Sequence, residues 1–192
     1  TETGGVMKKV LAFLAVIALL ATPSQFALAA SDVGFKSIGV DLGYVSPEDV
    51  DGTLGFGAFA DLGPLSQKVR LSTHLGFWSK SEDLGSGSEV SVRDISLTGR
   101  VRYMFPVSSP KFQPYAGGGL GFHSLRAEVY SPAVDLGGGV IIPAMTNSDS
   151  ELKLGLDLGG GFVTPVGAKT DLYGDLWYSM VEDFSQLSMK VG

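Results

Sequence analysis

Apolar and polar residues alternate along most of this chain. From Ile38 to Tyr44 the even-numbered residues are apolar, and the odd-numbered ones are glycine or aspartate. A period of two residues is typical of a β-strand, whose side chains point alternately to its two faces. The same alternation returns in the segments 53–62, 69–77, 94–105, 113–122, 152–162, 171–179 and 186–191. The pattern therefore predicts eight strands, each with one apolar and one polar face.

The composition of the polar face indicates which way the strands face. Gly, Ser and Asp make up most of it, and Arg and Lys supply charges of the opposite sign. A soluble barrel buries its apolar face, and its surface would carry more Lys and Glu. An outer-membrane barrel reverses the two faces. We expect this second arrangement, an all-β, eight-stranded antiparallel up-and-down transmembrane β-barrel, with a soluble lipocalin-like ligand-binding barrel as the alternative.

Aromatic residues on the apolar face are expected to mark the two membrane interfaces. Outer-membrane barrels carry such girdles at both interfaces. If the first strand runs outward, four aromatic residues end the outward strands and three end the returning ones. The predicted interfacial residues are Tyr44, Phe77, Phe122 and Tyr178 at the outer ends, and Tyr103, Phe105 and Phe162 at the inner ends.

The lengths of the connections predict the orientation in the membrane. Outer-membrane barrels have short periplasmic turns and longer external loops. The short, Pro-containing connections are 63–68, 106–111 and 165–170, and the connections on the opposite side are 45–52, 81–90 and 127–150. The last of these is the longest and carries apolar residues such as Tyr130, Ile141 and Met145. We expect loop 127–150 to contact an external partner or lipid.

The amino terminus carries the signal of an exported protein. Met7, Lys8 and Lys9 precede the short apolar run 10–20, and Ala27-Leu28-Ala29 forms an A-x-A site. This order is typical of a cleaved secretory signal peptide, and the run is short for a spanning helix. We expect cleavage after Ala29. Residues 1–29 would then be upstream residues plus the signal peptide, and residues 30–192 the barrel domain.

Composition excludes some classes of function. The chain has no cysteine, so disulfides and thiol chemistry are excluded. Its net charge is −6, which gives no basic footprint for nucleic acid, so nucleic acid is not an expected partner.

The stretch QPYAGGGLGF, residues 113–122, has two interpretations. A phosphate-binding loop needs a strand before it, a helix after it and a G-x-G-x-x-G spacing. The four glycines, Gly117, Gly118, Gly119 and Gly121, lack this spacing, and no helical period follows. In a narrow barrel, glycine lets a strand bend and leaves room for a large neighbour. The stretch is therefore predicted to be a curved wall strand.

The residues VRYMFP, a short turn and FQPYAGGGLGFH resemble the middle hairpin of the small OmpA/OmpX-like outer-membrane β-barrel proteins. The resemblance implies an eight-stranded barrel of a Gram-negative-type outer membrane, with both ends in the periplasm and delivery by the barrel-assembly machinery. It implies no enzymatic activity. Members usually end in an aromatic residue, whereas this chain ends in Met189-Lys190-Val191-Gly192. We therefore expect a few C-terminal residues to be missing, with a natural end at glycine as the alternative.

Charged residues on the polar face are predicted to pair inside the barrel, because a buried charge is tolerated when it is paired. A conduit for ions is the functional alternative, although an eight-stranded barrel is just wide enough for side chains to fill. The predicted interior network is Asp41, Asp61, Arg70, His74, Arg100, Arg102, His123, Lys153, Asp157, Asp175 and Lys190, with Asp94 and Asp171. Two histidines on separate strands are a weak metal signal, so we expect neither a metal nor a cofactor.

The sequence gives no sign of a catalytic site. Some small outer-membrane barrels hydrolyse lipid A with a His-x-Ser pair on one strand face, whereas His123 and Ser124 are adjacent and point to opposite faces. We expect a non-enzymatic barrel with a structural or surface-interaction role. A small passive transport barrel for hydrophobic or ionic solutes is the alternative.

Overall fold

The computed structural model describes residues 33–48, 50–108, 111–135, 137, 141–182 and 184–192. The predicted signal peptide and its cleavage site at Ala29 lie outside these residues. The strands are β1 (Ser37–Pro47), β2 (Thr53–Ser66), β3 (Val69–Gly85), β4 (Ser88–Met104), β5 (Gln113–Ser131), β6 (Val134–Asp135), β7 (Ile141–Ile142), β8 (Met145–Pro165), β9 (Asp171–Val181) and β10 (Phe184–Val191).

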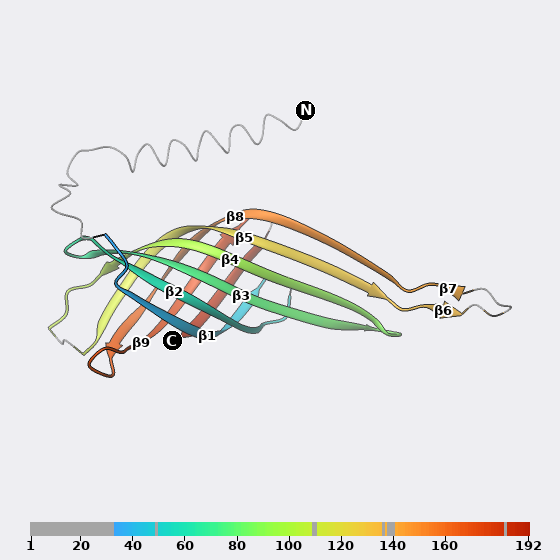
Figure 1. Cartoon of the computed structure of the whole chain (residues 1–192), viewed down its shortest axis with the longest axis horizontal. Helices are drawn as coiled ribbons and strands as arrows, with labels where there is room; N and C mark the ends of the chain where they lie inside the picture. The colour runs from blue at the N-terminus through green and yellow to red at the C-terminus, as the bar shows by residue number, and fades with distance from the viewer. Residues whose placement is uncertain (1–32, 49, 109–110, 136, 138–140, 183) are drawn as a thin grey trace, which may run out of the picture. The chain divides into compact units, whose positions relative to one another are not determined.

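Eight of the described strands close into one antiparallel barrel. Their order around the wall is β1-β10-β9-β8-β5-β4-β3-β2, while β6 and β7 pair only with each other at the tip of the hairpin formed by β5 and β8 (Figure 1). Each strand pairs with its neighbours in sequence, and β1 pairs with β10 to close the ring. The predicted eight-stranded up-and-down barrel is confirmed.

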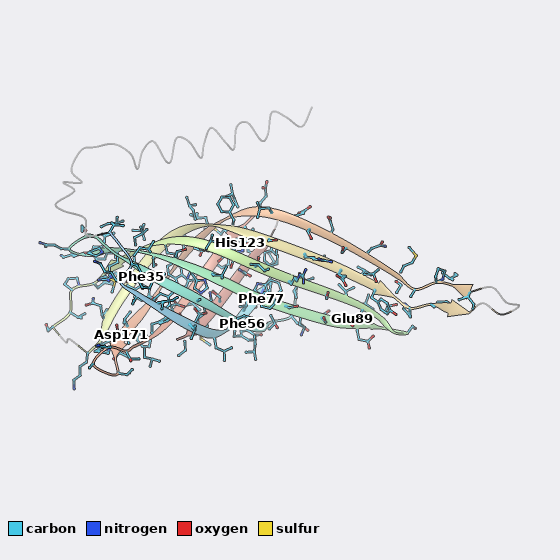
Figure 2. The ribbon with its side chains drawn as sticks, viewed as in Figure 1. Phe35, Phe56, Phe77, Glu89, His123 and Asp171 are labelled. Carbon is cyan, nitrogen blue, oxygen red and sulfur yellow. The ribbon has the colours of Figure 1, made fainter. Side chains whose placement is uncertain are left out.

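The apolar faces of the strands point outward. On β1, Ile38 and Val40 are 70% and 73% exposed. Asp41, the next residue after Val40, is only 6% exposed. Side chains such as Phe56 and Phe77 stand on the outside of the wall (Figure 2). A barrel with its apolar side chains on the outside is suited to contact with lipid. A soluble lipocalin-like barrel would bury these side chains, so this alternative is wrong.

The glycine-rich stretch is part of the wall, as predicted. It begins β5, which pairs with β4 on one side and with β8 on the other. A Cβ atom on Gly119 would lie 2.5 Å from the carbonyl oxygen of Gly99 and 2.8 Å from Cγ of Arg100. Glycine is needed here because a larger residue would occupy the space that the Arg100 side chain crosses.

Four strands are far longer than a membrane span requires. β3 and β4 have 17 residues each, β5 has 19 and β8 has 21, whereas about 9 to 11 tilted residues cross a bilayer. They continue past the rim of the barrel as a sheet on one side (Figure 1). We call residues 79–93, 126–131 and 145–154 of these strands the protruding sheet.

The protruding sheet corrects two predictions. Segment 81–90 is not a loop, because β3 and β4 continue to a tight turn at Gly85, Ser86 and Gly87, all with positive φ. Most of the predicted loop 127–150 is also strand, since β5 pairs with β8 as far as Ser131 opposite Met145. Phe77 and Phe122 therefore do not end their strands. Alternation alone missed these ends because the apolar face stops at the membrane while the backbone pairing continues.

The connections at the opposite end of the barrel extend less far from its rim than the protruding sheet does (Figure 1). They join β2 to β3, β4 to β5 and β8 to β9. Because outer-membrane barrels keep their periplasmic turns short and extend farther on the external side, we expect the protruding sheet to face the outside of the cell. No helix within the described residues is long and apolar enough to cross a membrane.

Candidate functional site: the barrel interior and the protruding sheet

An aspartate near the periplasmic end holds two arginines. The guanidinium of Arg70 donates to both carboxylate oxygens of Asp61, at 3.0 and 2.9 Å, and Arg102 Nη2 donates to Asp61 Oδ2 at 2.7 Å. The Tyr115 hydroxyl donates to Asp175 at 3.1 Å, and the Arg102 guanidinium lies 5.3 Å from the centre of the Tyr115 ring. Alternation places all five side chains inward, but only the fold shows which of them meet.

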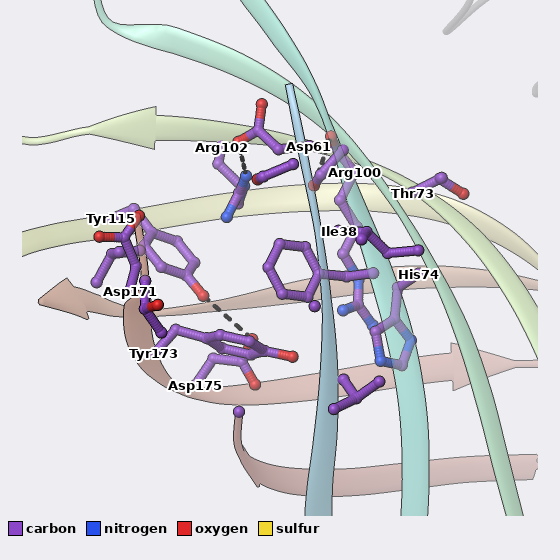
Figure 3. Close-up of a pocket in the computed structure, with 18 of the residues that line it drawn as sticks. Ile38, Asp61, Thr73, His74, Arg100, Arg102, Tyr115, Asp171, Tyr173 and Asp175 are labelled. Carbon is purple, nitrogen blue, oxygen red and sulfur yellow. Dashed lines mark hydrogen bonds and ion pairs between the residues drawn. The ribbon is translucent and has the colours of Figure 1, made fainter. Parts of the chain in front are cut away.

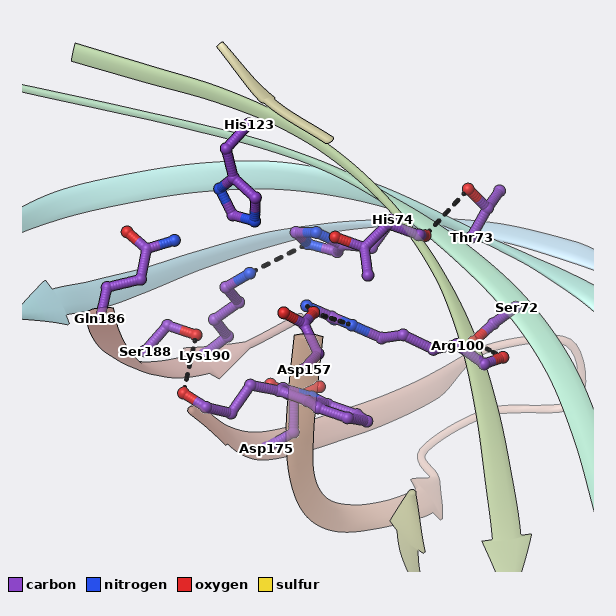
Figure 4. Close-up of polar contacts among 12 residues, drawn as sticks. Ser72, Thr73, His74, Arg100, His123, Asp157, Asp175, Gln186, Ser188 and Lys190 are labelled. Atoms are coloured by element: carbon purple, nitrogen blue, oxygen red, sulfur yellow. Dashed lines mark hydrogen bonds and ion pairs between the residues drawn. The ribbon is translucent and has the colours of Figure 1, made fainter. Parts of the chain in front are cut away.

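A second cluster joins four strands in the middle of the barrel. Asp41 Oδ2 accepts a hydrogen bond from the Tyr173 hydroxyl at 2.7 Å and lies 2.9 Å from His74 Nε2. The ammonium of Lys190 lies 3.2 Å from the same His74 nitrogen (Figure 4). Asp41, His74 and Tyr173 are buried, so the carboxylate is compensated by neighbours from β3 and β9.

Arg100 crosses the lumen between strands that are not neighbours. Its Nε and Nη2 donate to Asp157 Oδ2 at 3.0 and 2.9 Å, from β4 to β8 (Figure 4). The guanidinium also lies 4.3 Å from the ring centre of Trp177, which is a cation–π contact. Arg100 therefore fixes β4, β8 and β9 relative to one another.

A third cluster lies toward the outer end. His123 Nδ1 lies 2.8 Å from Asp94 Oδ2, and the Trp78 indole donates to Gln186 Oε1 at 2.8 Å. Gln186 Nε2 donates to the same Asp94 oxygen at 3.5 Å. Because Trp78, Asp94, His123 and Gln186 are all buried, these groups fill the lumen on four strands.

Two residues of the predicted network lie apart from these clusters. Lys153 is opposite His123 on the strand pair, but its ammonium pairs with Glu151 on the same strand at 2.9 Å. Asp171 is exposed, at the end of the barrel where β9 begins. Sequence alternation predicts the face of a side chain and not its height in the barrel, which explains both cases.

The sequence interpretation did not assign Trp78, Tyr115, Trp177 and Gln186 to the interior network. All four are buried and point inward. The available signal was parity, since each lies an even number of residues from a polar residue already assigned to the lumen. The rings of Trp78, Tyr115 and Trp177 obscured this signal, because aromatic residues were expected mainly on the lipid face.

The remaining space inside the barrel is uneven. A cavity of about 420 Å³ opens among Asp61, Arg102, Tyr115, Tyr173 and Asp175 in the periplasmic half (Figure 3). Above it, among His123, Gln186, Ser188 and Lys190, the space is only about 20 Å³, little more than one water molecule needs. The hydrogen-bonded side chains of the outer half thus fill most of the lumen.

The residues that could support catalysis or metal binding remain scattered. His123 is buried while Ser124 is exposed on the other face, as adjacent strand residues must be. Within the described ranges, neither histidine is hydrogen-bonded to a serine hydroxyl, and no three metal-ligating side chains gather as a cation site would require.

The predicted interfacial aromatic residues all lie on the outer surface of the wall. Phe77 contacts Phe56 with ring centres 5.0 Å apart, and Tyr103 contacts Phe105 edge-on at 5.2 Å. Phe162 stacks on Phe112 at 5.2 Å. Tyr44, Phe122 and Tyr178 are exposed on the same outer face. Their positions at the two membrane interfaces remain a prediction.

The protruding sheet has an unpaired edge along β8. Pairing between β8 and β9 begins at Gly155 opposite Val181, so residues 145–154 of β8 have a strand partner only on the β5 side. The opposite edge is the outer part of β3, whose pairing with β2 ends at Trp78 opposite Gly55. Backbone groups on such edges are available to another strand.

The family profile described as outer membrane protein beta-barrel domain matches residues 12–192. The chain belongs to this family. As a member it is an outer-membrane protein, and its apolar wall faces the membrane lipid. The predicted resemblance to small outer-membrane barrels is thereby confirmed. No curated protein matches the chain in sequence.

Two solved structures share the fold of this family member. Ail, the attachment invasion locus protein of Yersinia pestis, superposes with a TM-score of 0.55 at 15% identity, covering 81% of this chain and 94% of Ail. Neisserial surface protein A superposes with a TM-score of 0.50 at 17% identity, covering 81% of this chain and 96% of the other. At these identities the likeness establishes the barrel fold alone.

Proposed function

We propose that this outer-membrane barrel is a non-enzymatic surface-interaction protein that binds an extended segment of an external polypeptide along the β8 edge of the protruding sheet. The observation that supports this most directly is the edge of β8 at residues 145–153, which has no strand partner on the β9 side within the described residues. Main-chain N–H and C=O groups on a strand edge bind a further strand, and the side chains beside them select its sequence.

The inner face of the protruding sheet suits such a partner. Its two central strands present Val90 opposite Val129 and Val92 opposite Ala127, each partly or fully accessible. Charged residues such as Glu151 flank this apolar strip on the edge strand β8. An apolar strip with a polar rim is the usual composition of a protein-binding surface.

Charge favours a polypeptide over a sulfated polysaccharide. Ail was solved in complex with sucrose octasulfate, a heparin analogue. The protruding sheet of this chain carries six acidic residues against four basic ones. These are Glu82, Asp83, Glu89, Glu128, Asp149 and Glu151 against Lys80, Arg93, Arg126 and Lys153. An acidic surface repels a polyanion, so we propose a neutral or basic strand as the partner.

Transport receives less support from the interior. The buried pairs Arg100–Asp157 and Asp94–His123 occupy the lumen, and the space beside His123 and Gln186 is about 20 Å³. Ions and hydrophobic solutes larger than a water molecule would have to displace these side chains. A structural role of the interior network agrees with this filling.

The experiment compares cells that display the intact barrel with cells that display two shortened forms. Peptides selected from a phage-displayed library on the intact barrel serve as the probe. One variant replaces residues 126–150 by Asn-Gly, which joins the paired residues Leu125 and Glu151 and removes residues 145–150 of the β8 edge. The matched control replaces residues 83–89 by Asn-Gly between the paired residues Glu82 and Val90.

We expect the selected peptides to bind the intact barrel and the control, and to lose binding to the variant without residues 126–150. Equal binding to all three forms, or to cells with no barrel, would contradict the proposal. Heparin is tested in parallel, and binding of heparin that the first deletion abolishes would favour a polyanionic partner instead.

A further inference from the structure

Two arginines face each other on the outer surface of the wall. Arg93 on β4 is directly opposite Arg126 on β5. Both have the outward parity of Ile95, whereas Asp94 between Arg93 and Ile95 is almost completely buried. Arg93 is exposed and Arg126 is partly exposed. Like charges directly opposite on neighbouring strands are destabilising, so this pair calls for an anion.

The protein itself supplies a carboxylate for only one of the two arginines. Arg126 Nη2 pairs with Glu128 Oε2 at 3.1 Å, two residues farther from the membrane on the same face. In the part of the chain that the structure describes, the Arg93 guanidinium has no ion-pair partner. The Glu128 carboxylate therefore compensates Arg126 alone, and the guanidinium of Arg93 remains open to an external oxygen anion.

Serines continue this row on both sides. Ser79 on β3 is opposite Arg93, and Ser150 on β8 is opposite Arg126, so the row across the four strands reads Ser79, Arg93, Arg126 and Ser150. Hydroxyl groups donate to phosphate oxygens as readily as they accept. The outward side chains of this row are therefore two guanidinium groups and two hydroxyl groups, all of which can donate hydrogen bonds to an external anion.

The row lies immediately beyond the apolar wall. One step toward the periplasm, the outward residues on the same strands are Phe77, Ile95, Ser124 and Leu152. Leu152 is 72% exposed, as expected for a side chain in contact with acyl chains. Two residues of strand span about 7 Å, which places the guanidinium groups at the height where a lipid headgroup follows its acyl chains.

We propose that Arg93 and Arg126 together bind the phosphate group of an anionic lipid in the outer leaflet. The phosphate accepts charge-assisted hydrogen bonds from both guanidinium groups, and the acyl chains of the same lipid pack on Ile95 and Leu152. This dual contact distinguishes a lipid from free phosphate, which would gain nothing from the apolar row. The site is independent of the partner proposed for the β8 edge, because it uses the outward face of β4 and β5.

The test uses protein extracted from outer membranes in a neutral detergent and analysed by native mass spectrometry. Phosphatidic acid, which carries a phosphate monoester, is titrated against phosphatidylcholine with the same acyl chains. The variants are R93Q, R126Q and the double variant R93Q/R126Q. The matched control K80Q/K153Q removes two positive charges from inward positions of the same sheet. Heat-dependent gel mobility verifies that each variant is folded.

We expect the unaltered protein to bind phosphatidic acid more tightly than phosphatidylcholine, and the double variant to lose about tenfold or more in affinity for phosphatidic acid. The control should stay within about twofold, since its lysines do not face the lipid. Equal affinity of the double variant and the unaltered protein would overturn the proposal. Displacement of the lipid by millimolar inorganic phosphate, or by heparin, would overturn it in favour of a soluble anion or a polysaccharide.

Discussion

Arg100 reaches Asp157 across a strand that lies between them. In the pairing of the wall, Arg100 on β4 is opposite Gly119 on β5, and Gly119 is opposite Asp157 on β8. The guanidinium and carboxylate approach to 2.9 Å and are 7% and 1% exposed. The contact is possible because Gly119 has no side chain, so the glycine-rich stretch opens a path for an ion pair instead of binding a phosphate.

The first prediction concerns this path. Gly119→Ala should reduce the folded fraction, because the added Cβ would lie 2.5 Å from a backbone oxygen and 2.8 Å from Arg100. Gly99→Ala is the control, since the nearest atom to its Cβ would be 3.9 Å away. The heat-sensitive band on a gel after refolding measures the folded fraction. Equal folded fractions of the two variants would contradict the prediction.

The second prediction concerns the ion pair itself. Asp157→Asn or Arg100→Met should lower the free energy of unfolding by about 3 to 5 kcal/mol, because each leaves a buried charge without its partner. The double variant R100M/D157N should lose less than the sum of the two. Urea unfolding in lipid vesicles, followed by Trp fluorescence, provides the values. Additive losses would show that the pair is not coupled.

The third prediction tests the lipid face. Leu97→Arg should cost about 2 to 4 kcal/mol of folding free energy, since it places a charge in the middle of the apolar wall. Leu84→Arg, in the protruding sheet, should change stability by less than about 0.5 kcal/mol. Both leucines are exposed, so accessibility alone would predict equal effects. Urea titrations in vesicles distinguish the two, and equal costs would place residue 84 in the membrane or residue 97 outside it.

The fourth prediction concerns conductance. The unaltered barrel should show no discrete current steps in a planar bilayer, because the His123–Asp94 and Trp78–Gln186 contacts fill the outer half of the lumen. A variant with Trp78→Ala and Gln186→Ala should conduct more often, since it removes two of the four side chains of that cluster. Regular steps in the unaltered barrel would support the transport alternative.

The sequence by itself determined how many strands form the barrel wall and which face of each strand is apolar. Alternation with a period of two is a local property, since consecutive side chains of any strand point to opposite faces. It therefore placed Ile38 outside and Asp41 inside without knowledge of the neighbours. The same reasoning made 113–122 a wall strand, and composition decided that the apolar face meets lipid.

Only the tertiary structure decided which residues meet. Register between strands fixes that Gly119 lies between Arg100 and Asp157, and that Arg93 faces Arg126, because both facts depend on how far each strand slides along the next. The protruding sheet also required the fold. In the protruding sheet the side chains no longer face lipid on one side and the lumen on the other, so the apolar pattern no longer indicates a strand. The hydrogen-bonded pairing of β3, β4, β5 and β8 nevertheless continues there.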